Sequence, residues 1–299
     1  MKKTIILIAA IISISSCYSQ TAHEYVLRGE AKYKLLDYRG AIADYDKAIE
    51  VEPKQYDTYI SRGNAKYYLL DYRGAIADYD KAILLIPEKV SFLVVLTKRN
   101  AYINRAEVKY ELQDYRGAIA DYSKLIELGL DSLAYFDRGL AKSHLQDYRG
   151  AIVDYNKAIK FAPNHAPSYY KRGLAKSNLQ DHRGAIADYN KAIEKMKWHG
   201  AFFEHRPDFS EDFIERKIVE SADVISARGL AKSALQDYRG AIEDFNKAIE
   251  LNPDDSKPYF SRGLAKLKIG QKDSGCLDFS KSGELGNETA YETIKKYCN

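Results

Sequence analysis

Apolar and small residues recur with a helical period from the first repeated stretch of the chain onward. In EYVLRGEAKYKLL (24–36), and again in YRGAIADYDKAIE (38–50), they return at intervals of three and four. This spacing places them on one face of an α-helix. Asp37 stands just before the second run, where a helix N-cap is expected, and Pro53 follows it, where the helix cannot continue. The stretch therefore predicts two helices joined by a short turn.

The same pair of predicted helices is repeated along the chain. DYRGAI at 37–42 returns unchanged at 71–76, 114–119, 147–152 and 237–242, and as DHRGAI at 181–186. One such pair buries a single stripe on each helix and cannot form a core by itself. Stacked neighbours can, so the repetition predicts a linear array of helix pairs.

These units resemble tetratricopeptide repeats. In the first unit the pattern of aromatic, small and closing residues falls on Tyr25, Gly29, Ala41, Tyr45, Ala48 and Pro53. The second, fourth and sixth units follow it well. The third has Ala106 and Leu125 at two of the small positions, the fifth lacks the closing proline, and the seventh has Gly275 and Ser282. The resemblance implies an all-α, right-handed superhelical solenoid of about seven helix-turn-helix units.

The repeat spacing also sets the expected boundaries. The array is expected over 22–285, with units that begin near 22, 56, 99, 132, 166, 222 and 256, and with a capping helix over 286–299. Insertions interrupt it near 90–98 and 200–221. The first insertion, VSFLVVLTK, is apolar and is expected to lengthen the first helix of the third unit. An exposed contact for dimerisation is the alternative.

The repeated DYRGAI segment is interpreted as scaffold. Residues present in every unit serve the fold, which is what all units have in common. Ala41 is expected to allow close approach where Gly29 faces it, and Tyr45 to fill the joint with the next unit. Asp44 and Lys47, three residues apart, are expected to pair on the exposed side. The alternative is that the six repeated arginines contact a periodic ligand.

Binding residues are then expected at positions that vary between units. The resemblance implies that the first helices line a concave groove, which would display Tyr33, Asn64, Tyr67, Tyr68, Glu107, Tyr110, Phe136 and Tyr170. Aromatic groove residues are typical anchors for a peptide or a helix. The alternative is that tyrosine is merely abundant, at 25 of 299 residues. The clamp with which some family members hold a C-terminal carboxylate is not expected, because Val26, Ile60, Ile103 and Phe136 stand where its basic residues would lie.

The insertion near 200–221, with the residues just before it, is rich in aromatic side chains. We expect either a contact point for a partner or a flap over the chain's own repeats. The residues concerned are Trp198, Phe202, Phe203, Phe209 and Phe213. His199, Glu204 and His205 lie in the same stretch, but no further ligand pair accompanies them, so no metal or cofactor is expected.

Composition and motifs exclude several classes of function. The net charge is +4, and acidic and basic residues alternate along each predicted helix, which argues against a nucleic-acid surface. The sequence contains no phosphate-binding loop, nucleophile elbow or zinc-binding helix motif. A non-catalytic scaffold for a protein or peptide is therefore expected. A glycan- or peptidoglycan-associated module, or an accessory subunit of an envelope enzyme complex, is the alternative.

The first nineteen residues predict export. Lys2 and Lys3 precede an apolar run that is too short for a membrane span, as in a Sec-type signal peptide of a bacterial protein. Two processing routes fit: cleavage after Ser19, or lipidation at Cys17 within a lipobox-like sequence. The protein would act in the periplasm, at the outer membrane or outside the cell. In such a compartment Cys276 and Cys298 are expected to form a disulfide, with two free cysteines as the alternative.

Overall fold

The computed structural model describes residues 21–87, 91–129, 133–203 and 211–298, with side chains in all of these except 197–220. Every regular element in these ranges is an α-helix, which confirms the all-α class predicted from the sequence. The predicted signal peptide and Cys17 lie outside the described residues. The chain divides into two compact lobes, an N-terminal lobe (Met1–Asp131) and a C-terminal lobe (Ser132–Asn299).

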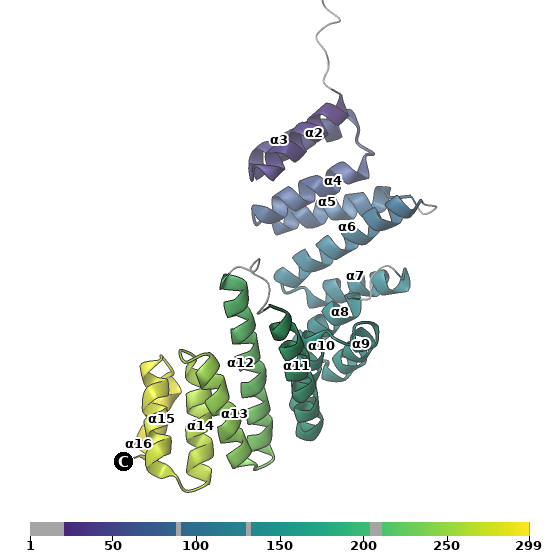
Figure 1. The fold of residues 1–299 in the computed structure, drawn as a ribbon. Helices are drawn as coiled ribbons and strands as arrows, with labels where there is room; N and C mark the ends of the chain where they lie inside the picture. Colours follow the sequence, from purple (N-terminus) through teal and green to yellow (C-terminus); the bar gives the residue numbers. More distant parts are fainter. Residues whose placement is uncertain (1–20, 88–90, 130–132, 204–210, 299) are drawn as a thin grey trace, which may run out of the picture. The chain divides into compact units, whose positions relative to one another are not determined.

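The N-terminal lobe holds three helix pairs, shown in purple to teal in Figure 1. Their bounds are α2 (Ala22–Lys34), α3 (Tyr38–Val51), α4 (Tyr56–Tyr68), α5 (Tyr72–Leu85), α6 (Phe92–Glu111) and α7 (Tyr115–Glu127). Each helix contacts the next along the chain, and the first helices of successive pairs, α2, α4 and α6, also contact one another. α6 is 20 residues long and includes most of the apolar insertion. One surface of this lobe is thus formed by first helices.

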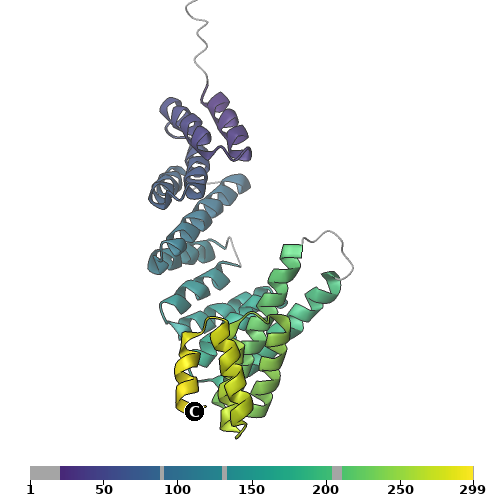
Figure 2. The ribbon, with the colours of Figure 1, turned by 90° about the vertical axis from the view of Figure 1, so that its left-hand side faces the viewer.

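The C-terminal lobe continues the same arrangement and ends in a single helix, as the turned view in Figure 2 shows. Its helices are α8 (Ala134–His144), α9 (Tyr148–Phe161), α10 (Ala166–Asn178), α11 (His182–Phe203), α12 (Glu211–Ala234), α13 (Tyr238–Leu251), α14 (Ser256–Lys268), α15 (Lys272–Glu284) and α16 (Glu288–Tyr297). The insertion near 200–221 falls at the facing ends of α11 and α12, which are 22 and 24 residues long. α16 packs on α15, and the structure joins Cys276 to Cys298.

The turn between the two helices of a pair is built the same way in successive repeats. Leu36 adopts a left-handed conformation, with φ of 62°, and the next amide, that of Asp37, donates to the Lys32 carbonyl at 2.9 Å. The Asp37 carboxylate then accepts from the Gly40 amide at 2.9 Å, which confirms the predicted N-cap. A Cβ at Gly40 would lie only 2.0 Å from that carboxylate. The glycine of DYRGAI is therefore required by the cap.

The packing of the small positions differs in one detail from the sequence interpretation. Ala41, Tyr45 and Ala48 are fully buried, as expected of scaffold residues. The residue closest to Gly29 across the pair is Tyr45, which the sequence interpretation did not name: a Cβ at Gly29 would lie 2.6 Å from Tyr45 Cε1. The glycine of the first helix is therefore matched to the large aromatic of the second, because the flat ring occupies the space that a side chain would need.

The expected pair between Asp44 and Lys47 is wrong. Asp44 is buried, and its carboxylate binds Arg28 through both oxygens and Lys32 at 2.8 Å. A buried carboxylate must be paired, which the sequence interpretation of this position overlooked. The same arginine–aspartate–lysine triad recurs with Asp78, Asp121, Asp154, Asp188, Asp244 and Asp278.

The triads also connect successive repeats. The second terminal nitrogen of Arg62 donates to Asp46 of the preceding repeat at 2.6 Å, while its other nitrogens bind Asp78. Arg172 makes the corresponding bond to Asn156 at 2.6 Å, and Arg262 to Asn246 at 2.7 Å. One arginine thus joins the two helices of its own repeat and couples that repeat to its neighbour.

Candidate functional site

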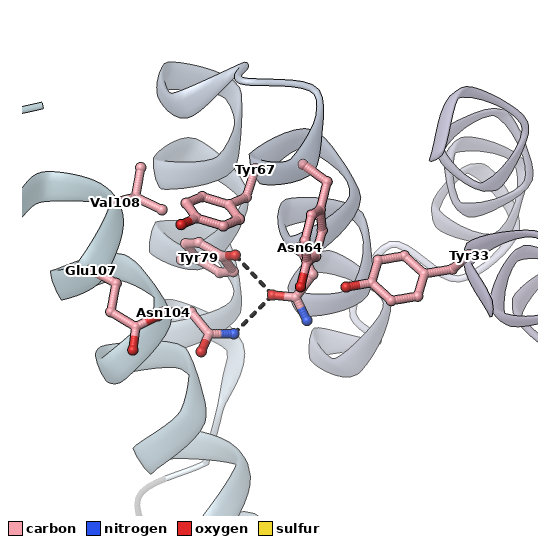
Figure 3. Close-up of a pocket in the computed structure, with 8 residues that line it drawn as sticks. Tyr33, Asn64, Tyr67, Tyr79, Asn104, Glu107 and Val108 are labelled. Atoms are coloured by element: carbon pink, nitrogen blue, oxygen red, sulfur yellow. Dashed lines mark hydrogen bonds between the residues drawn. The ribbon is translucent and has the colours of Figure 1, made fainter. Parts of the chain in front are cut away.

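A pocket opens between the first helices of the N-terminal lobe. It has a volume of about 180 Å³ and is drawn in Figure 3. Its lining residues come from α2, α4, α5 and α6 and are Tyr33, Asn64, Tyr67, Tyr68, Tyr79, Asn104, Glu107 and Val108. A space of this size has room for several water molecules or for one extended side chain.

Helical spacing explains why these residues meet. Asn64, Tyr67 and Tyr68 lie three and four apart on α4, and Asn104, Glu107 and Val108 repeat that spacing on α6. Residues at these intervals share one helix face. Because α4 contacts both α2 and α6, Tyr33 in the last turn of α2 comes beside the α4 residues.

Asn64 is the polar centre of the pocket. Its Oδ1 accepts a hydrogen bond from the Tyr79 hydroxyl at 2.8 Å and another from Asn104 Nδ2 at 2.8 Å. Figure 3 shows the Asn64 side chain between Tyr33 on one side and Tyr67 and Tyr79 on the other. The two bonds fix the orientation of the amide, so that its NH₂ group points away from both donors.

The tyrosine rings support one another edge to face. The Tyr68 ring lies 5.8 Å from that of Tyr33 at 73° and 5.5 Å from that of Tyr67 at 76°. On its other side it stacks on Tyr38 at 4.8 Å. Such ring pairs hold their partners in place beyond the effect of area burial. The rings that form the wall of the pocket are therefore already packed against one another before a ligand binds.

The pocket carries one acidic side chain and no basic one among its lining residues. Glu107 is exposed, and desolvation by the groups around it, and then the nearby Glu111 carboxylate, raise its pKa. Burial also raises the pKa values of Tyr33, Tyr67 and Tyr79, so these phenols stay neutral near pH 7. The site therefore presents neutral hydroxyls, two amides, aromatic faces and a single carboxylate.

The structure brings together five of the eight groove residues that the sequence singles out: Tyr33, Asn64, Tyr67, Tyr68 and Glu107. Tyr110 lies on α6 but faces Tyr115, at 5.2 Å, and does not line the pocket. Two others lie in the C-terminal lobe. Phe136 packs on Tyr155 and on His165. Tyr170 packs on Tyr189, and burial raises its pKa to about 12.

Sequence reasoning missed three lining residues, Tyr79, Asn104 and Val108. Tyr79 occupies in the second repeat the scaffold position that Tyr45 occupies in the first, and its ring fills the core, but its hydroxyl reaches Asn64. Asn104 could have been found from its position three residues before Glu107 on the same predicted helix. Val108 is fully buried and forms part of the pocket floor.

The aromatic residues of the second insertion lie outside the part of the chain for which side chains are described. This holds for Trp198, Phe202, Phe203, Phe209 and Phe213. Their contribution to binding stays a prediction. The C-terminal lobe has a second pocket of about 180 Å³ elsewhere, between residues that include His144, Tyr148, Lys171 and Asn178.

Comparison with protein families matches most of the repeats. Models described as "Tetratricopeptide repeat" match residues 25–55, 103–167 and 166–194, and one described as "TPR repeat" matches 229–270. The chain belongs to the tetratricopeptide repeat family. This family and its fold are typically non-catalytic interaction scaffolds.

Individual tetratricopeptide repeat proteins match a smaller part of the chain than the family models do. Over 64 residues the chain is 36% identical to "Small glutamine-rich tetratricopeptide repeat-containing protein 2" of Mycosarcoma maydis. That match covers 21% of this chain and 18% of the relative's length.

Two crystal structures show the same fold. A tetratricopeptide repeat protein from Parabacteroides merdae covers 93% of this chain and 99% of its own, with a TM-score of 0.59 and 19% identity. YrrB, described as a TPR protein with an unusual peptide-binding site, covers 72% of this chain and 95% of its own, with a TM-score of 0.53 and 19% identity. At these identities the likeness shows the fold alone.

The described residues contain neither a membrane-spanning helix nor a cluster of metal ligands. None of the described helices is long and apolar enough to cross a membrane. No group of three or more histidine, cysteine, aspartate or glutamate side chains within the described part of the chain has the arrangement of a metal site.

Proposed function

We propose that this tetratricopeptide repeat protein is a non-catalytic scaffold that binds an extended segment of a protein partner along the first helices of the N-terminal lobe. The observation that carries the proposal is the pocket around Asn64. It combines aromatic faces with oriented amides, and the side chains of the described residues leave it open.

The chemistry of the pocket suits a peptide. The Asn64 and Asn104 amides offer donors and acceptors to a peptide backbone, and the tyrosine faces offer apolar area to a side chain. The aromatic wall needs little reorganisation on binding, because its rings are already packed against one another. The fold shared with YrrB, which is described as having a peptide-binding site, is compatible with this assignment.

We further propose that the scaffold acts in the bacterial cell envelope. The support is the signal-like segment 1–19 together with the Cys276–Cys298 pair, since disulfides persist in oxidising compartments. Cleavage after Ser19 gives a free periplasmic or secreted protein, whereas lipidation at Cys17 gives a tethered one. The mass of the mature protein from its native envelope distinguishes the two forms.

A peptide-display selection tests the binding proposal. Peptides selected on the wild-type protein should bind the Tyr67→Ala and Asn64→Ala variants at least tenfold more weakly. Tyr297→Ala is the matched control, because Tyr297 is an exposed tyrosine on α16, in the other lobe. It should bind the peptides as the wild type does. Circular dichroism confirms that each variant is folded.

Two results would contradict the proposal. Failure to select any peptide, combined with binding of purified cell-wall fragments that Tyr67→Ala abolishes, would favour the glycan-binding alternative. Selected peptides whose affinity is the same for all three variants would place binding elsewhere on the protein.

A further inference from the structure

The charged side chain that lines the pocket is negative, and no positive one lines it. Glu107 stands at its rim, and Glu111 lies one turn further along α6. Glu107 is exposed, and among the described residues no hydrogen bond or ion pair satisfies its carboxylate; desolvation by the surrounding groups, and then Glu111, raise its pKa. Two carboxylates one helical turn apart are stabilised by a cation between them.

The basic residues of the repeat pattern on α4 and α6 are paired with the buried aspartates. Lys66 binds Asp78 at 2.8 Å, and Lys109 binds Asp121 at 2.8 Å. Arg62 and Arg105 bind the same two aspartates and also reach back to the preceding repeat. The basic residues that the repeat pattern places on these two helices are thus held in the buried triads, away from Glu107.

The rest of the pocket suits a cation with an apolar stem. Tyr33, Tyr67 and Tyr68 present aromatic rings that attract a positive charge over their faces. Val108 and the rings offer apolar surface to a methylene chain. Tyrosine hydroxyls and the Asn104 amide oxygen, from different helices, surround the site, whereas the Asn64 oxygen is already occupied by two donors. An ammonium group donates in three directions, which matches acceptors spread over several helices better than the planar fork of a guanidinium.

We propose that this pocket receives the ammonium group of a lysine side chain from the partner, with Glu107 as its counter-ion and the tyrosine rings as its walls. The proposal rests on the proposed function, since the lysine belongs to the bound segment. It assigns to this chain a preference for a cationic anchor, which is opposite in charge to the carboxylate that the clamp of some relatives holds.

Four synthetic peptide libraries test this assignment. They are nonapeptides with degenerate flanks and a central lysine, acetyl-lysine, norleucine or arginine, and their binding is measured by fluorescence polarisation. The lysine library should bind the wild type about tenfold more tightly than the acetyl-lysine and norleucine libraries, because only lysine carries the charge. Glu107→Gln should remove this difference, whereas binding of the norleucine library should be unchanged.

Glu50→Gln is the matched control. It removes one negative charge from the same lobe, at an exposed position on α3 that does not line the pocket. It should leave the lysine preference intact, which separates a local effect of Glu107 from a change in net charge. Measurement at two salt concentrations gives a second readout, because surface attraction is screened more strongly than a contact inside the pocket.

The outcomes separate the two proposals. Equal binding of the lysine and acetyl-lysine libraries, with both weakened by Tyr67→Ala, overturns the ammonium site and leaves the peptide groove in place. Tighter binding of the arginine library also overturns the ammonium assignment. No binding of any library to the wild type contradicts the peptide groove itself.

Discussion

At the scale of single residues, the repeats depend on pairs of a glycine and an aromatic residue, in which the missing side chain of the glycine leaves space for the ring. Gly63 lies against Tyr79, and a Cβ added to this glycine would come within 2.7 Å of the ring. Tyr79 in turn donates its hydroxyl to Asn64 in the pocket. The glycine, the ring and the amide therefore form one chain of contacts from the core to the candidate site.

We predict that Gly63→Ala lowers the free energy of unfolding by about 1–3 kcal/mol, because the added methyl group overpacks the core against Tyr79. Alanine is the better helix former by about 1 kcal/mol, so propensity alone predicts the opposite sign. Urea unfolding followed by circular dichroism measures the change. Ala106→Gly serves as the reverse control, because the third repeat already carries alanine at this position. A stabilised Gly63→Ala variant would contradict the packing argument.

At the scale of helices, the buried triads hold each pair together. Asp44 lies on α3, while Arg28 and Lys32 lie on α2, so one carboxylate bridges both helices of the first repeat. Hydrogen bonding to Arg28, and then to Lys32, lowers the pKa of Asp44 to about 2 despite its burial. The ionised carboxylate is therefore part of the folded structure.

We predict that Asp44→Asn destabilises the protein near pH 7 by about 1–2 kcal/mol. The two cations are partly exposed and screened, so the cost is smaller than that of breaking a fully buried pair. Since the folded pKa of Asp44 lies below its unfolded value, its contribution is complete above about pH 4 and is lost as the pH falls through about 2.

Urea unfolding of both proteins at several pH values between 2 and 7 checks this prediction. The difference between wild type and Asp44→Asn should shrink only at the acid end of the series. Asp37→Asn is a suitable control, because asparagine also caps a helix and Asp37 lies on the surface. A difference that stays constant down to pH 2 would contradict the role of the Asp44 charge.

At the scale of the whole molecule, the array is a series of local contacts. Within each lobe, each helix packs on its neighbours along the chain, and the arginines of the triads link a repeat to the preceding one. Stability in such arrays is approximately the sum of repeat and interface terms. The last repeat packs on α13 through α14, whereas on its other side only the single helix α16 packs on α15.

We predict that the Cys276–Cys298 bond stabilises this end of the array. It closes a loop with a sequence separation of 22 residues and ties α16 to α15. The loop-entropy model gives about 3 kcal/mol for a loop of this length. Hydrogen exchange of α15 and α16, compared between the wild type and Cys298→Ser, measures the effect. Amides of α2 and α3, in the other lobe, are the internal control. Unchanged exchange of α16 would contradict the prediction.

Much of the fold could be predicted because it depends on short-range patterns. Asp37 caps its helix three residues before Gly40, and Tyr45 and Ala48 share one face of α3, so their roles follow from spacing alone. Part of the candidate site could be predicted from the sequence for the same reason. Tyr67 and Glu107 each belong to a first helix whose exposed face could be traced from the repeat.

The sequence by itself determined the helices, their repeated order and the family, because these follow from periodicity and from residues present in every repeat. Only the tertiary structure decided that Asp44 pairs with Arg28 and Lys32, that Gly29 faces Tyr45, and that Asn104 and Tyr79 meet at Asn64. These contacts join different helices, and the distance and rotation between two packed helices are set by the summed packing of all their side chains. No local pattern along one helix specifies that sum.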